Sequence, residues 1–150
     1  MILSGWGNNF KIDSKVINFQ NLKNNHISSC IARGSGRSYG NSSLNRKTVV
    51  STIKLNKILY FNKIKGIIKC QSGLQIFELL EMIIPCGWML PCSPGSKFIS
   101  IGGMVASNAH GKDQHLNGNF GSFVNELKLE TLKKIIICSR SKNRDYFYNT

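Results

Sequence analysis

The stretch from Pro94 to Gly121, PGSKFISIGGMVASNAHGKDQHLNGNFG, most constrains what this chain can fold into. It places six glycines and two histidines around a short apolar core at residues 99–101 and 104–106. Glycine loses more backbone freedom on folding than any other residue, so chains concentrate it where the backbone turns tightly or approaches another group closely. We therefore predict a glycine-rich turn that faces a cofactor.

Small and polar residues within this stretch could line such a site. Gly102 and Gly103 would allow a close approach of the backbone, and Ser100, Ser107 and Asn108 supply short hydrogen-bonding side chains. These residue types suit contacts with the backbone or ring of a bound cofactor.

His110 and Lys112 are the candidates for proton handling or charge stabilisation. His110 stands beside Gly111, which leaves one side of the imidazole uncovered, and imidazole can exchange a proton near neutral pH. The alternative is that His110 and Lys112 are ordinary solvated loop residues. No paired carboxylates, metal-ligand cluster or nucleophile elbow is visible in the sequence.

A second glycine loop, RGSGRSYG at residues 33–40, is a candidate anion site. Glycines at three positions free backbone N–H groups to converge, and Arg33 and Arg37 add positive charge. The dinucleotide fingerprint G-x-G-x-x-G fails because Tyr39 stands where its last glycine belongs, and no acid follows about 20 residues on. The alternative is a pair of glycine turns with solvated arginines.

The pattern of the chain predicts an α+β domain. We expect strands at residues 15–19, 27–32, 48–53, 66–71, 124–132 and 135–138. Apolar residues from Ile76 to Ile83 recur at helical spacing, with Ser72 and Gln75 as a capping box and Pro85 as a stop. We also expect a surface turn or short helix at residues 20–25, a turn at residues 133–134 and a helix that starts at residues 145–147.

Composition indicates one globular domain. The chain has 150 residues, of which 41% are hydrophobic and 18% charged, so it can bury a core. Its net charge of +13 raises the possibility of a polyanion partner, but the basic residues are spread along the chain without a run of like charges. We expect no nucleic-acid binding, and keep a basic nucleic-acid-binding protein as the alternative from another class.

The five cysteines form no C-x-x-C pair, which predicts free thiols, no zinc site and no disulfide framework. Neither a signal peptide nor an apolar run of membrane-spanning length is present in the sequence. We expect a cytoplasmic protein.

The two glycine segments together resemble those of FAD-linked oxidases with the vanillyl-alcohol-oxidase, or PCMH-type, FAD-binding domain. The resemblance rests on IARGSGRSYG at residues 31–40, PGS at 94–96, IGG at 101–103, HGK at 110–112 and GNFGSFV at 118–124, and includes LSGWG at 3–7. Its nearest branch is the decaprenylphosphoryl-β-D-ribose 2-oxidases, with sugar-alcohol and aldonolactone oxidases more distant. The resemblance covers nearly the whole chain.

The resemblance implies a site along both segments. In the family, the first loop cradles the FAD diphosphate and the second segment runs beside the diphosphate, ribityl chain and isoalloxazine. The implied cofactor residues are Ala32, Arg33, Gly34, Ser35, Gly36, Arg37, Ser38, Tyr39, Gly40, Asn41, Gly95, Ser100, Ile101, Gly102, Gly103, Ser107, Asn108, Ala109 and His110. His110 and Lys112 would lie near the flavin and the substrate. Many relatives attach FAD covalently to a histidine, but Arg37 occupies that position here, which predicts non-covalent FAD.

The resemblance also implies that residues 1–150 are the N-terminal part of an FAD-binding domain whose remainder, with a substrate domain, is absent. The parent reaction would transfer hydride from a sugar or alcohol carbon to the flavin. We expect a polyprenyl-phosphate-linked pentose as substrate, and hence work at the inner face of the membrane. The chain alone is expected to bind FAD weakly and not to turn over substrate, with the missing domain on the same or a separate chain.

Overall fold

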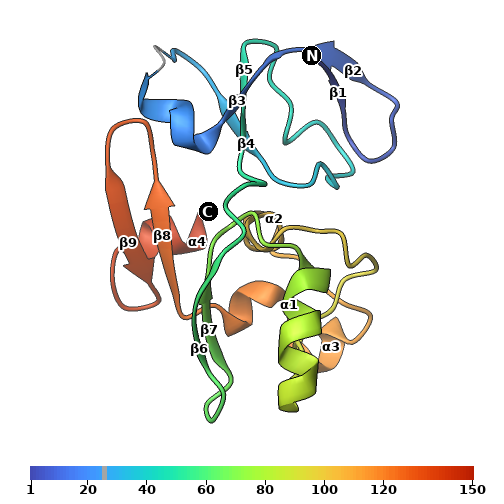
Figure 1. Cartoon of the computed structure of the whole chain (residues 1–150), viewed down its shortest axis with the longest axis vertical. Coiled ribbons are helices and arrows are strands. Elements are labelled where there is room, and N and C mark those ends of the chain that lie inside the picture. The colour runs from blue at the N-terminus through green and yellow to red at the C-terminus, as the bar shows by residue number, and fades with distance from the viewer. Residues whose placement is uncertain (25–26) are drawn as a thin grey trace.

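A three-stranded parallel sheet forms the upper half of the molecule (Figure 1). In this computed structural model, which describes residues 1–24 and 27–150, β3 (Lys15–Asn18) and β4 (Ile31–Arg33) both pair with β5 (Thr48–Ser51). Val49 and Val50 of β5 are buried, as the centre of a parallel sheet requires. The predicted strands at residues 15–19 and 48–53 are confirmed, whereas only the end of the predicted strand at 27–32 is extended.

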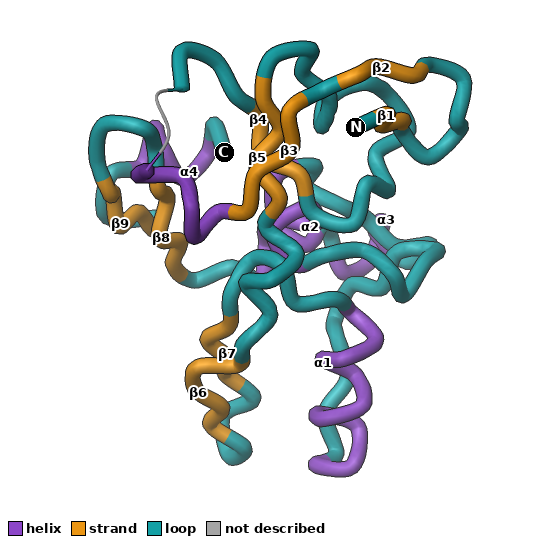
Figure 2. The backbone as a smooth tube through the Cα atoms, turned by 45° about the horizontal axis from the view of Figure 1, so that its top comes forward, coloured by secondary structure: helices purple, strands orange, loops and turns teal. Residues whose placement is uncertain are grey.

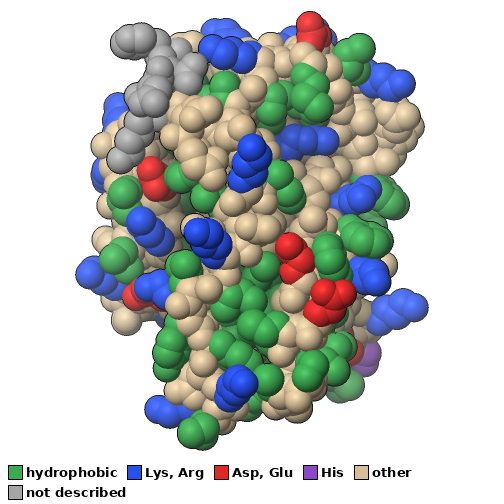
Figure 3. Space-filling model, viewed as in Figure 1, with side chains coloured by type: hydrophobic (Ala, Val, Ile, Leu, Met, Phe, Trp, Pro, Cys, Tyr) green, Lys and Arg blue, Asp and Glu red, His purple; other side chains and the backbone are tan. Residues whose placement is uncertain are grey.

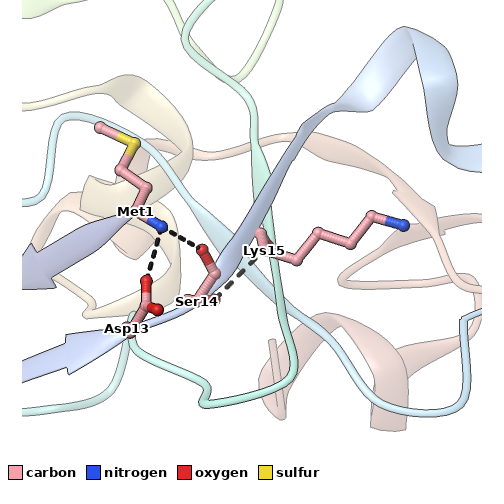
Figure 4. A network of polar contacts seen from close by, with 4 residues as sticks. All are labelled: Met1, Asp13, Ser14 and Lys15. Carbon is pink, nitrogen blue, oxygen red and sulfur yellow. Dashed lines mark hydrogen bonds and ion pairs between the residues drawn. The ribbon is translucent and has the colours of Figure 1, made fainter.

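A hairpin at the N-terminus covers this sheet, and the sequence did not reveal it. β1 (Ile2–Ser4) pairs antiparallel with β2 (Lys11–Asp13), and Leu3 and Ile12 pack on Val49. The N-terminal ammonium donates hydrogen bonds to Asp13 Oδ1 at 2.6 Å and to the carbonyl of Ser14 at 2.9 Å (Figure 4). The bond from this ammonium, with its charge, lowers the pKa of Asp13.

The short helix that follows β3 is the 3₁₀ helix η1 (Phe19–Asn24). It matches the turn or short helix predicted at residues 20–25, except for Asn25, which lies outside the described residues.

The lower half contains an antiparallel hairpin and a helix that pack against each other (Figure 2). β6 (Ile58–Asn62) pairs with β7 (Ile67–Cys70), and their inner side chains contact Leu79 and Ile83 of α1 (Ile76–Ile83). The helix and β7 were predicted, but β6 was missed. A 3₁₀ turn, η2 (Ile84–Cys86), ends α1 as the proline predicted.

The predicted cap of α1 was wrong by three residues. Gln75, not Ser72, is the N-cap residue, and Glu78 Oε2 accepts a hydrogen bond from the Gln75 N–H at 2.8 Å. The carbonyl of Ser72 instead accepts a bond from Gly102. Tertiary contact therefore moved the start of the helix.

The stretch that was predicted as a turn contains helices. α2 (Ile101–Ala106), α3 (Gln114–Asn117) and the 3₁₀ helix η3 (Phe120–Phe123) follow one another. Met104 and Phe120 bury their side chains against Cys92 and Ile76. Gly102 and Gly103 thus stand in the first turn of a short helix.

The last elements are a hairpin and a helix. β8 (Glu126–Glu130) pairs with β9 (Ile135–Ser139), and α4 (Arg144–Tyr148) lies against β9. Thr131 Oγ1 accepts hydrogen bonds from the N–H groups of Lys133 and Lys134, which makes the turn without an Asn-Gly pair. Both strands and the helix were predicted. None of the helices in the described part of the chain is long and apolar enough to cross a membrane.

Residues 71–75 join the two halves. The carbonyl of Leu55 accepts the Gly73 N–H at 2.7 Å, while the carbonyls of Ser72 and Leu74 accept the N–H groups of Gly102 and Ile101 at 2.7 and 2.8 Å. A Cβ on Gly73 would lie 2.0 Å from the carbonyl oxygen of Thr52. Only glycine fits at this crossing.

Gly73→Ala should therefore lower the free energy of unfolding by about 2–3 kcal/mol, because the methyl group must displace main chain. Urea denaturation measures this. Gly95→Ala is the matched control, since no atom of the described residues lies within 4 Å of a Cβ at Gly95. The control should change stability by less than about 0.5 kcal/mol. Equal effects of the two substitutions would contradict the packing described for Gly73.

Candidate functional site

The first glycine loop begins where two parallel strands end. It follows β4 directly, and the Arg33 carbonyl accepts a hydrogen bond from the N–H of Thr52, just beyond β5, at 2.9 Å. Ligands of parallel sheets bind outside the carboxyl ends of the strands. The loop therefore starts from an edge that is suited to a ligand.

Several hydrogen-bond donors of this loop have no acceptor in the part of the chain that the structure describes. Among the described residues, none accepts a hydrogen bond from the main-chain N–H groups of residues 35–41. Ser35 Oγ is buried and has no hydrogen-bond partner in the described part of the chain. Gly36 has a φ of 68°, which turns successive N–H groups toward one side of such a loop. An anion with several oxygens would satisfy these donors. Ser35 Oγ is buried, so leaving it unpaired is costly, whereas the N–H groups at the exposed residues 37 and 39–41 are accessible to a ligand.

Arg33 holds the loop in place from below. Its guanidinium donates to Ser43 Oγ at 3.0 Å and to the Ser4 carbonyl at 2.7 Å. Burial lowers the pKa of Arg33. A Cβ on Gly36 would lie 2.3 Å from Arg33 Nη2, so the loop closes tightly over this side chain. The hydrogen bonds of Arg33 thus go to protein groups.

Arg37 extends over a row of aromatic side chains. Its guanidinium carbon lies 4.9 Å from the ring centre of Trp6 and 6.0 Å from that of Phe98, and Phe98 packs on Phe77. Trp6 and Phe98 are half exposed. Reasoning from the sequence did not pair Arg37 with these rings, because they come from segments far apart in the chain.

The second glycine segment meets the first at one point. A Cβ on Gly34 would lie 2.0 Å from Ser100 Oγ, and Ser100 is buried as the N-cap residue of α2. The structure thus brings these two predicted residues together. The N–H groups of Ile101 and Gly102 are bonded to the carbonyls of residues 74 and 72, so neither is free for a ligand.

The far end of α2 is locked by internal hydrogen bonds. Ser107 Oγ donates to the Gly103 carbonyl at 2.7 Å, and Asn108 Oδ1 accepts the Gly121 N–H at 3.0 Å. Asn108 has a φ of 41°. The Ala109 carbonyl accepts the Phe120 N–H at 2.8 Å. These residues fix the path of the chain that follows.

His110 and Lys112 leave this rigid turn with exposed side chains. His110 Nδ1 lies 3.5 Å from the Gly111 carbonyl oxygen, a weak contact. Gly111 is buried, and a Cβ there would lie 2.9 Å from the Ser93 carbonyl oxygen. The backbone between the two side chains is thus held while the side chains themselves face solvent. Their exposure leaves both groups available to a ligand or partner.

The parallel sheet, the loop of unpaired donors and the packed second segment are the features of a PCMH-type FAD-binding domain. Residues 14–133 match the family described as FAD binding domain, and the chain belongs to this family of FAD-dependent oxidoreductases. The resemblance inferred from the two glycine segments is confirmed.

Similar proteins support the same assignment. Decaprenylphosphoryl-beta-D-ribose oxidase of Mycolicibacterium smegmatis is 32% identical over 102 residues, 67% of this chain and 22% of the relative. D-lactate dehydrogenase of Anaerostipes hadrus is 38% identical over 72 residues, 48% of this chain and 15% of the relative. The chain therefore spans a small part of the length of these curated relatives.

A solved structure shares the fold. Carbohydrate oxidase from Microdochium nivale superposes with a TM-score of 0.69 at 18% identity, over 80% of this chain and 26% of that chain.

Gly34→Ala should separate the two segments and lower the free energy of unfolding by about 2 kcal/mol, because its methyl group meets Ser100. Adding Ser100→Gly removes the clash, so the double variant should be more stable than the sum of the two effects by about 1 kcal/mol or more. Urea denaturation of the four proteins in this cycle measures the coupling. Gly95→Ala combined with Ser100→Gly should be additive, and strict additivity for Gly34 would refute the contact.

Proposed function

We propose that the loop at residues 32–41 binds the diphosphate of FAD, in an oxidoreductase that oxidises a sugar or alcohol carbon. The observation that supports this proposal is that, within residues 1–24 and 27–150, the N–H groups at residues 35–41 have no acceptor and the buried Ser35 Oγ has no partner. A diphosphate carries negative charge on several oxygens and needs many converging donors. The donor set fits this group.

Some residues of the loop would bind the diphosphate, and others hold the loop in place. Ser35, Gly36 and Ser38 present donors, while Arg33 braces the loop through Ser43 and the Ser4 carbonyl. No atom of the described residues lies within 4 Å of a Cβ built on Gly40, which leaves room for a ligand against the backbone. Ala32, Gly34, Arg37, Tyr39 and Asn41 complete the proposed contact set of this loop.

The second segment is proposed to lie along the remainder of the cofactor. Gly95 has open space where a side chain would stand, which suits a ring or ribityl chain against the backbone. Because the N–H groups of Ile101 and Gly102 are already bonded, these residues would contact the cofactor through carbon atoms. The other proposed contacts are Ser100, Gly103, Ser107, Asn108, Ala109 and His110.

His110 and Lys112 are proposed to act on the reacting side. Bound FAD would supply the acceptor for the hydride that leaves the substrate carbon. His110 and Lys112 carry exposed groups on a rigid turn, and a cationic or donating group there would stabilise negative charge. As the hydride leaves the carbon, the hydroxyl proton of the substrate would pass to a general base.

The substrate proposed is a polyprenyl-phosphate-linked pentose, with action at the inner face of the membrane. The support is the relative from Mycolicibacterium smegmatis, which is named as an oxidase of decaprenylphosphoryl-beta-D-ribose. A sugar-alcohol or aldonolactone oxidase is the alternative within the same chemistry.

FAD should bind more tightly than riboflavin, since riboflavin lacks the diphosphate that the loop would hold. Fluorescence titration of the purified chain measures both. Ser35→Ala should weaken FAD binding about tenfold or more, because it removes one hydrogen bond to a charged group, and leave riboflavin binding unchanged. Ser42→Ala, at an exposed serine just beyond the loop, is the matched control and should change neither. Equal affinity for FAD and riboflavin would refute the proposal, and salt-sensitive retention on DNA without flavin binding would favour the nucleic-acid alternative.

Acid precipitation should release the flavin into the supernatant. Arg37, which stands at the position of the covalent histidine in many relatives, has a guanidinium that is not a nucleophile and lies over Trp6. Absorbance of the supernatant and of the denatured pellet measures the distribution. Flavin that remained with the pellet would contradict non-covalent binding.

A further inference from the structure

The hairpin of β6 and β7 carries an unusual combination of exposed residues. Residues 57–70, KILYFNKIKGIIKC, contain four lysines and no acidic residue. Ile64 at the tip is 91% exposed, and Leu59, Tyr60 and Ile67 are also exposed. In the space-filling view, basic and hydrophobic side chains gather without acidic ones around the lower end of the molecule, where this hairpin ends (Figures 1 and 3).

The exposed residues share the tip and the outer face. Strand side chains alternate between two faces. Phe61 and Ile68 pair across the hairpin and pack inward. Tyr60 pairs with Lys69, so this aromatic–basic pair stands on the opposite face. One face of the hairpin therefore packs on the core, and the solvent-exposed face carries apolar and basic side chains together.

The tip is built to hold Ile64 outward. Asn62 Oδ1 accepts the N–H groups of Ile64 and Lys65 at 3.0 and 2.9 Å. Trp88 Nε1 donates to the carbonyl of Lys63 at 2.7 Å, and Trp88 fills the space beside Gly66, whose φ is 63°. These bonds hold the backbone of the turn, and Ile64 stands at its outer end with its side chain in solvent.

We propose that this hairpin is a membrane-surface anchor that inserts Ile64 among the lipids of an anionic bilayer. Lysines attract anionic headgroups, their stems and Tyr60 suit the interface, and an aliphatic tip gains by leaving water. A nucleic acid would match the charge but leave Ile64 in water. The net charge of +13 adds a long-range attraction to a negative surface.

Vesicle co-sedimentation of the whole chain tests this. It should bind phosphatidylcholine vesicles that contain about a third phosphatidylglycerol, and not vesicles of phosphatidylcholine alone. Ile64→Asp should weaken binding about tenfold or more, because it removes the buried side chain and adds a repelled charge. The double substitution Lys63→Gln with Lys65→Gln should weaken it about fivefold per lysine.

Leu132→Asp is the matched control. Leu132 is 55% exposed beside Lys133 and Lys134 in the β8–β9 turn, which lies far from the β6–β7 tip in Figure 1. The charge change is the same, so binding should stay within about twofold of the unsubstituted chain. Equal losses for Ile64→Asp and Leu132→Asp, or no binding to anionic vesicles, would overturn the proposal. Binding to heparin or RNA that exceeds vesicle binding and ignores Ile64→Asp would indicate a polyanion partner and also overturn it.

Trp88 provides a second measurement that does not need Ile64 to be changed. In a Trp6→Phe variant, Trp88 is the remaining tryptophan and stands directly behind the tip. Its fluorescence should be quenched by brominated lipids in anionic vesicles and not in neutral ones. Binding without quenching would place another surface against the bilayer and refute the anchor.

Discussion

The crossing of residues 71–75 is the contact on which the rest of the structure depends. Here Gly73 passes against the Thr52 carbonyl, and the carbonyls of Ser72 and Leu74 hold the start of α2. Backbone hydrogen bonds in this interior are geometrically demanding, so few arrangements of the flanking elements satisfy all of them. The parallel sheet above, and α1 with its hairpin below, are oriented by this crossing.

The candidate FAD site follows from the same contact. Because α2 is fixed by residues 72 and 74, its N-cap Ser100 stands under Gly34 and supports the first loop. Arg33 braces that loop from the side of β1. The packing beneath the loop fixes its backbone, so that the N–H groups at the exposed residues 37 and 39–41 are open to a ligand.

The tip of the β6–β7 hairpin resembles the glycine loop in one respect: its backbone is held while a side chain is exposed. At the tip of the β6–β7 hairpin, the side chains of Asn62 and Trp88 hydrogen-bond the backbone of residues 63–65, while the side chain of Ile64 faces water. In both places hydrogen bonds or packing hold the main chain, while unpaired N–H groups in one and an exposed isoleucine in the other face outward. Unsatisfied groups on rigid supports are characteristic of binding surfaces, because little ordering is required when a partner arrives.

The sequence by itself determined the family, the two glycine segments and most elements, since glycine spacing, helical periodicity and β-branched runs are local signals. Only the tertiary structure decided the rest. It moved the cap of α1 from Ser72 to Gln75 and made Gly102 part of a helix, because a neighbouring segment supplied hydrogen-bond partners that no local pattern records. It also turned Arg33 inward to Ser4 and Ser43 and placed Arg37 over Trp6. The contacts with Ser4 and Trp6 join residues that are distant in the chain. The glycine content of residues 94–121 can be read from the sequence, whereas the contacts that shape this stretch come from residues distant in the chain.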